Sequence, residues 1–126
     1  SKARLIDLMD QLKSFGYSVE LDDFGKNYSS LEMLTYDFLD MIKMDFSLVS
    51  EVGRSPRAEM LISYTARFCH ETEMLCLAEG VETAEQCAAI RELGCDLVQG
   101  YYFGRPISSK EFQKKFLFPD LEIEDE

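Results

Sequence analysis

The sequence has little positive charge and a single histidine. It carries 13 lysines and arginines against 24 aspartates and glutamates, which gives a formal net charge of −11. This balance excludes a basic surface of the kind that binds DNA or RNA, and a phosphate-bearing ligand would need help from metal ions or a placed lysine. His70 has no partner in the sequence and is interpreted as a surface residue.

Long apolar runs and paired cysteines are also missing. No stretch reaches the roughly 18 apolar residues of a membrane-spanning helix. The cysteines show no CxxC spacing and lie within apolar segments, which favours buried thiols over disulfides or a zinc site; they are Cys69, Cys76, Cys87 and Cys95. We therefore expect a cytoplasmic domain, while a membrane anchor elsewhere in a longer parent protein stays open.

What the chain does have is a regular alternation of expected helices and strands. Its 126 residues are 46% hydrophobic, enough for one globular core. A first helix should end at Gly16, and four strand-helix units should follow. We expect strands at about 18–24, 40–45, 74–80 and 96–103, and helices at about 31–36, 55–72, 83–94 and 108–117. The capping signals at the starts of these helices are Ser29, Ser55, Thr83 and Ser108. This order favours a parallel sheet with helical crossovers.

Polar residues fall at or just beyond the carboxyl end of every expected strand. That distribution is typical of the active-site face of a TIM-like (β/α) barrel, because an open doubly wound sheet uses only the strands at its switch point. A complete barrel needs about 250 residues. The fold class expected is therefore α/β, a half barrel of about four β/α units after an initial helix.

Two adjacent carboxylates, Asp22 and Asp23, end the first expected strand in "LDDFGKNYSSLEML". A solvated turn explains them simply, because Asp and Gly are common turn residues. A metal site is the alternative, since Asp22, Asp23 and Glu79 are hard oxygen donors suited to Mg²⁺ or Mn²⁺. Neighbours in a regular strand point to opposite faces, so one shared site requires the backbone to turn at Asp22 or Asp23.

Four segments, "LDDFGKNYSSLEML", "DMIKMD", "LAEGVET" and "ELGCDLVQGYYFGRP", together resemble the C-terminal half of the EAL domain, the bacterial module that hydrolyses cyclic di-GMP. The resemblance covers about residues 1–118, and 119–126 form an acidic tail. It implies a TIM-like barrel, two divalent cations and a water activated between them to attack a phosphodiester.

The resemblance also implies roles for individual residues. Glu79 and Lys43 match catalytic positions, and Asp22 and Asp23 match metal ligands. Four further residues match ligand-binding or loop-supporting positions: Asp45, Glu82, Gln99 and Arg105. An ordinary surface ion pair between Lys43 and Asp45 is the alternative for that strand, and either face of the strand could be the covered one.

Two departures from the family pattern bear on activity. Lys26 and Asn27 stand where the family usually has threonine and glycine, and the family's first half, with its remaining ligands, is absent. We therefore expect a fragment that does not by itself hold the two cations and is inactive alone, from a parent phosphodiesterase. The alternative is a degenerate EAL domain that senses cyclic di-GMP or docks a protein. An open half barrel also leaves unpaired edges, so self-association is expected.

Overall fold

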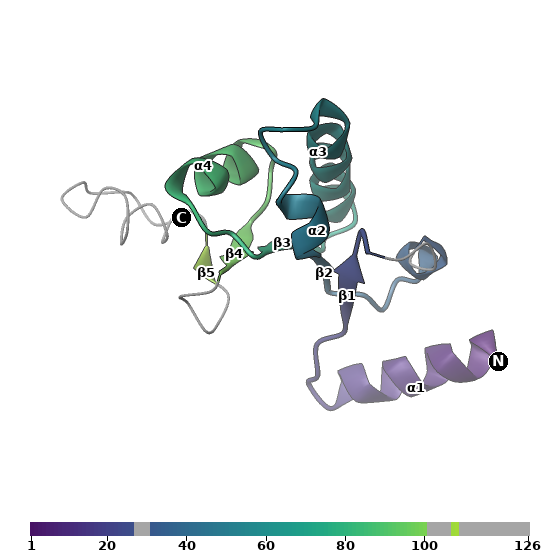
Figure 1. Ribbon diagram of the computed structural model, residues 1–126. Coiled ribbons are helices and arrows are strands. Elements are labelled where there is room, and N and C mark those ends of the chain that lie inside the picture. The colour runs from purple at the N-terminus through teal and green to yellow at the C-terminus, as the bar shows by residue number, and fades with distance from the viewer. Residues whose placement is uncertain (27–30, 101–106, 109–126) are drawn as a thin grey trace.

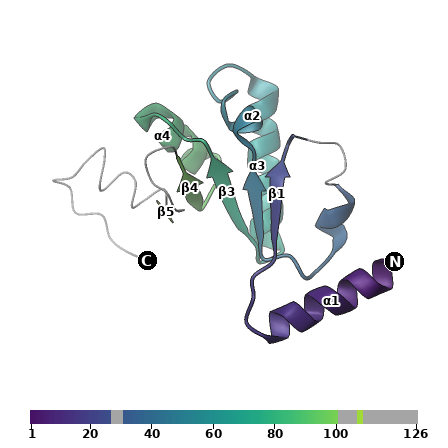
Figure 2. The ribbon, with the colours of Figure 1, turned by 60° about the horizontal axis from the view of Figure 1, so that its bottom comes forward.

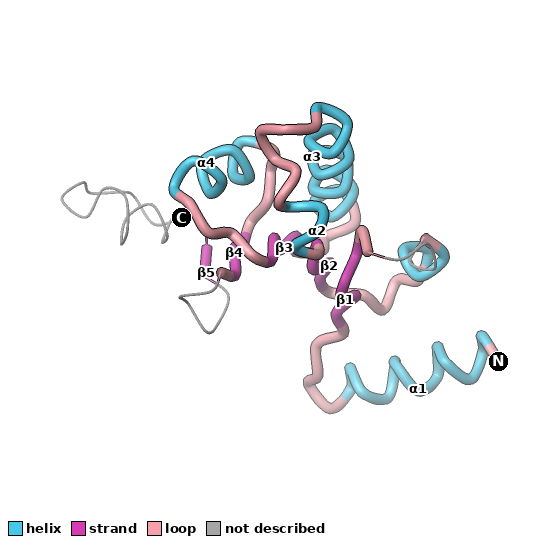
Figure 3. Tube along the Cα trace, in the orientation of Figure 1, coloured by secondary structure: helices cyan, strands magenta, loops and turns pink. Residues whose placement is uncertain are grey.

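The computed structural model describes residues 1–26, 31–100 and 107–108, which form one sheet with helices packed against it (Figures 1 and 3). In chain order the elements are α1 (Lys2–Ser14), β1 (Glu20–Phe24), the 3₁₀ helix η2 (Glu32–Thr35), β2 (Met41–Met44), α2 (Phe46–Val49), α3 (Pro56–Glu71), β3 (Leu75–Glu79), α4 (Ala84–Glu92), β4 (Leu97–Gln99) and β5 (Ile107–Ser108).

The sheet has the strand order β1-β2-β3-β4-β5, and its first four strands are parallel. Figure 2 shows β1, β2 and β3 side by side with their arrowheads at one end, where α2 also lies. Parallel strands require crossover connections, and here these contain η2, then α2 and α3, then α4. The predicted α/β architecture of a partial barrel is confirmed.

The fourth unit contains a short strand that was not predicted. Ser108, the expected cap of a helix, pairs with Leu97 in the strand β5, which runs antiparallel to β4. This pairing is compatible with a cap at Ser108, because an N-cap residue has an extended backbone. The rest of the helix expected at 108–117, and the acidic tail at 119–126, lie outside the described residues.

Helix boundaries largely follow the predicted capping signals. Ser55 caps α3 with Pro56 at its first position, and Thr83 forms a reciprocal capping box with Gln86 at the start of α4. Gly16 follows α1 with a φ of 91°, which a residue with a Cβ adopts only with strain. The helix expected at 31–36 is only the 3₁₀ turn η2, and its expected cap Ser29 lies outside the described residues.

The core lies between one face of the sheet and helices α3 and α4, which Figure 1 shows on the same side. Residues alternate along β2, so that Ile42 and Met44 are fully buried while Lys43 between them is only partly buried. The helices contribute fully buried Ile62 and Ile90. All four cysteines are buried and free, as predicted. Helices long and apolar enough to span a membrane are absent from the described part of the chain.

Asp40 joins three elements near the start of β2. Its carboxylate accepts from Lys13 Nζ at 2.5 Å and from the Val19 N–H at 2.8 Å, while its own N–H donates to the Val19 carbonyl at 2.8 Å. Its carbonyl accepts from the N–H of Leu75 at 3.0 Å. Burial tends to raise the pKa of Asp40, but the hydrogen bonds from Lys13 and Val19 together outweigh it and lower that pKa.

We expect Asp40→Asn to destabilise the fold by about 1 kcal/mol at neutral pH, because it removes the charge from these hydrogen bonds. A lowered folded-state pKa gives stability that is present above the ordinary aspartate value of 3.8 and is lost as pH falls through the folded value. Denaturant titrations between pH 7 and pH 3 should therefore show a flatter acid limb for the variant. Exposed Asp37→Asn is the control, and an equally steep acid limb in Asp40→Asn would contradict this role.

Candidate metal centre

The backbone turns at the paired aspartates. Asp23 has a φ of 56°, and the pairing of β1 with β2 loses its regular register between Leu21 and Phe24. The Asp23 N–H donates to Asp22 Oδ1 at 2.8 Å. Asp is among the residues that tolerate the left-handed conformation, so this turn costs less here than at a bulkier residue. The turn that a shared site requires is therefore present.

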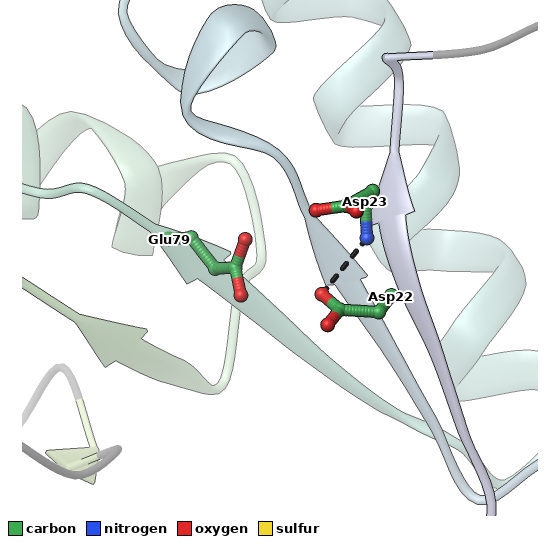
Figure 4. A group of neighbouring side chains, drawn as sticks. All are labelled: Asp22, Asp23 and Glu79. Atoms are coloured by element: carbon green, nitrogen blue, oxygen red, sulfur yellow. Dashed lines mark hydrogen bonds between the residues drawn. The ribbon is translucent and has the colours of Figure 1, made fainter.

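Three carboxylates meet at this edge of the sheet. One oxygen from each of Asp22, Asp23 and Glu79 lies within 4.8 Å of the others. Figure 4 shows the Glu79 side chain reaching from β3 toward Asp22 and Asp23 on β1. Within residues 1–26, 31–100 and 107–108, no other group of three histidine, cysteine or acidic side chains has this spacing. Convergent hard oxygen donors fit Mg²⁺ or Mn²⁺ in charge and in chemical type.

The cluster is electrostatically strained without a cation. Burial raises the pKa of Glu79, and the negative charge of Asp22 raises it further, whereas Lys43 opposes both effects. Crowded carboxylates resist ionising together, and a dication placed among them reverses that balance.

Lys43 supplies a positive charge beside the cluster. Its ammonium lies 3.5 Å from Glu79 Oε1 and 3.9 Å from Glu20 Oε2, and its side chain is 18% exposed. The sequence left open which face of β2 carries it, and the structure places it opposite the core. Lys43 does not form the alternative surface ion pair with Asp45, because the Asp45 carboxylate accepts hydrogen bonds from Ser47.

Glu20 is a neighbour that the sequence analysis missed. It lies on β1 and is paired in register with Met41, two residues before Lys43 on the adjacent strand. Alternation in the two strands could have indicated it, because Glu20 and Asp22 share a face in a regular strand. Glu20 belongs to none of the four segments that resemble the EAL domain, so the motifs did not indicate it.

Gln99 lies directly opposite Glu79 in the pairing of β3 with β4. Its Oε1 is buried and has no hydrogen-bond partner among the described residues. A buried acceptor of this kind is costly unless it is satisfied, so a ligand or bound water would stabilise it.

Asp45 caps α2 and accepts from the N–H of Ser47 at 2.9 Å and from its Oγ at 2.6 Å. Those hydrogen bonds, the side-chain one first, lower the pKa of Asp45, and the charge of Lys26 contributes. The carboxylate is therefore held in its ionised form at the edge of the cluster.

Of the remaining predicted residues, the structure describes Glu82 and Lys26. Glu82 is exposed in the turn before α4, where its N–H donates to Gln86 Oε1 at 2.9 Å. Lys26 donates its N–H to the carbonyl of Asp23 at 3.1 Å, and within the described ranges it makes no ion pair with Glu82. Arg105 and Asn27 fall outside the described residues.

Comparison with known proteins identifies the arrangement. The EAL domain family matches residues 1–106. The chain is 37% identical over 116 residues to the cyclic di-GMP phosphodiesterase NbdA of Pseudomonas aeruginosa, covering 90% of this chain and 15% of NbdA.

Two solved structures show the same fold. An EAL domain protein from Listeria monocytogenes has a TM-score of 0.77 and 34% identity, covering 92% of this chain and 47% of that one. BlrP1 of Klebsiella pneumoniae, in complex with manganese and cyclic di-GMP, has a TM-score of 0.75 and 31% identity, covering 86% of this chain and 28% of that one. The chain thus spans less than half the length of each of these proteins.

In the absence of metal, we expect Glu79→Gln to raise the melting temperature by a few degrees, because it removes a charge that the fold disfavours. A raised folded-state pKa means that the free energy of unfolding decreases as pH rises from the ordinary glutamate value of 4.5 through the raised value. The variant should lack that decrease. Melting curves from pH 4 to pH 8 with a chelator present measure it, and a lower melting temperature throughout would contradict the strained cluster.

Proposed function

Because the chain belongs to the EAL domain family, we propose that Asp22, Asp23 and Glu79 bind divalent cations, Mg²⁺ or Mn²⁺, with which the intact protein hydrolyses cyclic di-GMP. The convergence of the three carboxylates at the carboxyl ends of parallel strands carries this proposal. The name of NbdA and the manganese and cyclic di-GMP in the BlrP1 complex support it.

A divalent cation in this position supplies a water of lowered pKa and positive charge for the attacking and leaving oxygens. The residues of the chain supply the rest. Glu79 would hold the cation or accept a proton from the attacking water, and the Lys43 ammonium at 3.5 Å from it would orient a water or a phosphate oxygen. Gln99 Oε1, which has no hydrogen-bond partner among the described residues, would accept a hydrogen bond from the bound nucleotide or its water.

Three carboxylates are fewer ligands than two cations of six-fold oxygen coordination use, even with several waters. We therefore propose that the 126-residue chain alone binds a cation weakly and has no measurable turnover. The remaining ligands come from chain that the EAL relatives have beyond the matched segment.

A second candidate function is binding without hydrolysis, in which a degenerate EAL domain senses cyclic di-GMP or docks a protein. Lys26 favours it, because its positive charge acts on Asp45 beside the cluster and so competes with a cation for the local negative charge. This candidate predicts retained nucleotide affinity with little turnover.

We also propose that residues 1–118 form the family domain, of which the family match covers 1–106. The four free, buried cysteines are typical of a reducing compartment such as the cytoplasm.

A chimera tests the activity. When this chain replaces the matched 116-residue segment of NbdA, we expect hydrolysis of cyclic di-GMP with Mg²⁺ or Mn²⁺. Glu79→Gln in the chimera should lower kcat by about 10²–10⁴-fold, the usual contribution of a proton-transfer group. Glu85→Gln, on the exposed first turn of α4, is the matched control and should leave kcat unchanged. A folded chimera that binds the nucleotide without turnover would favour the sensor instead.

Self-association of the isolated chain is a separate proposal. β1 has only β2 as its partner in the described sheet, and the face of β3 away from the core carries Leu75 at 46% exposure. Open edges and apolar faces promote pairing, although the net charge of −11 opposes it. Sedimentation velocity should show a mass that rises with concentration, more strongly at 0.5 M salt, where charge repulsion is screened. A monomer at all concentrations in both buffers would contradict the proposal.

A further inference from the structure

Helix α2 contacts both turns that follow the carboxylate-bearing strands. A Cβ built on Gly25 would lie 3.1 Å from Leu48 Cδ2, and one built on Gly80 would lie 2.4 Å from Phe46 Cδ2. Gly25 comes two residues after Asp23, and Gly80 directly follows Glu79. The helix therefore reaches the end of β1 with one side chain and the end of β3 with another.

Backbone hydrogen bonds fix both turns, one of them to the cap of α2. The N–H of Asp45, which caps α2, donates to the Phe24 carbonyl at 2.8 Å, and the N–H of Gly80 donates to the carbonyl of Gln99 on β4 at 2.7 Å. Gly25 and Gly80 have φ values of 99° and 79°, so each turn combines a left-handed backbone with close approach of a side chain. Both conditions select glycine.

Phe46 is not explained by the core alone. It is 49% exposed, whereas Leu48 and Val49 in the same helix are 8% and 0% exposed. A large aromatic ring that is half in solvent adds less to stability than a buried one, since the hydrophobic gain scales with the area removed from water. Its ring nevertheless packs on the residue next to Glu79, at a distance that excludes any side chain there.

We infer that α2 is a positioning element for the metal centre, in which Phe46 and Leu48 fix the separation of Glu79 from Asp22 and Asp23. Like charges crowded at this edge push the strand ends apart. A helix packed on both turns opposes that movement and keeps the carboxylates preorganised for a cation, as outer contacts commonly do for metal ligands. The inference rests on the proposed function, because it takes these carboxylates as cation ligands.

The test measures Mn²⁺ binding to the 126-residue chain by the loss of the free-ion electron paramagnetic resonance signal. Phe46→Ala should weaken binding about tenfold, the lower end of the range for residues that support metal ligands. Phe46→Tyr should restore it, because the ring is kept. Val49→Ala is the matched control: it removes fully buried atoms from the same helix and should lower the melting temperature more than Phe46→Ala does, with little change in affinity.

Amide hydrogen exchange without metal gives a second readout. Phe46→Ala should speed exchange of the Gly80 N–H, relative to amides in α3, because the turn after β3 loses the ring that packs on it. Unchanged Mn²⁺ affinity and unchanged exchange in Phe46→Ala would overturn the inference while leaving the metal centre intact. A wild-type chain that binds no Mn²⁺ would overturn the metal centre, and this inference with it.

Discussion

The local turn at Asp23 is the constraint on which the candidate site depends. In a regular strand Asp22 and Asp23 would point to opposite faces, and only one could meet Glu79. The left-handed conformation at Asp23, together with the break in register with β2, brings both carboxylates to the same edge. The other features of the centre surround these carboxylates. Lys43 lies between two glutamates, and α2 packs closely on the two glycines that flank the cluster.

The sheet provides the rigid frame for this local strain. Helices α3 and α4 bury one face completely, so that the chemical side chains of β2, β3 and β4 are confined to the other face. Crowding three carboxylates costs free energy, which contacts elsewhere in the fold offset. Lys43 reduces this cost, and a bound cation would also reduce it. A bound cation would therefore stabilise this site relative to the empty one.

Much of this was predictable from sequence, for identifiable reasons. The capping signals at Ser55 and Thr83 and the alternation around Lys43 are local, and the elements they predict are present. The alternation could not show which face of β2 packs on the core, because both the face of Ile42 and the face of Lys43 carry a methionine that could be buried. Helix α2 is too short for a periodic pattern, and β5 arises from pairing with a distant strand, so neither left a local signal. Glu20 was missed because its partner Lys43 is adjacent only across the sheet.

Diffraction from crystals of the chain grown with Mn²⁺, at a wavelength where manganese scatters anomalously, tests the central claim most directly. The account predicts an anomalous peak about 2.0–2.6 Å from carboxylate oxygens of Asp22, Asp23 or Glu79, the usual range for oxygen-ligated divalent cations. A peak bound only elsewhere on this acidic surface, or none at saturating Mn²⁺, would contradict it.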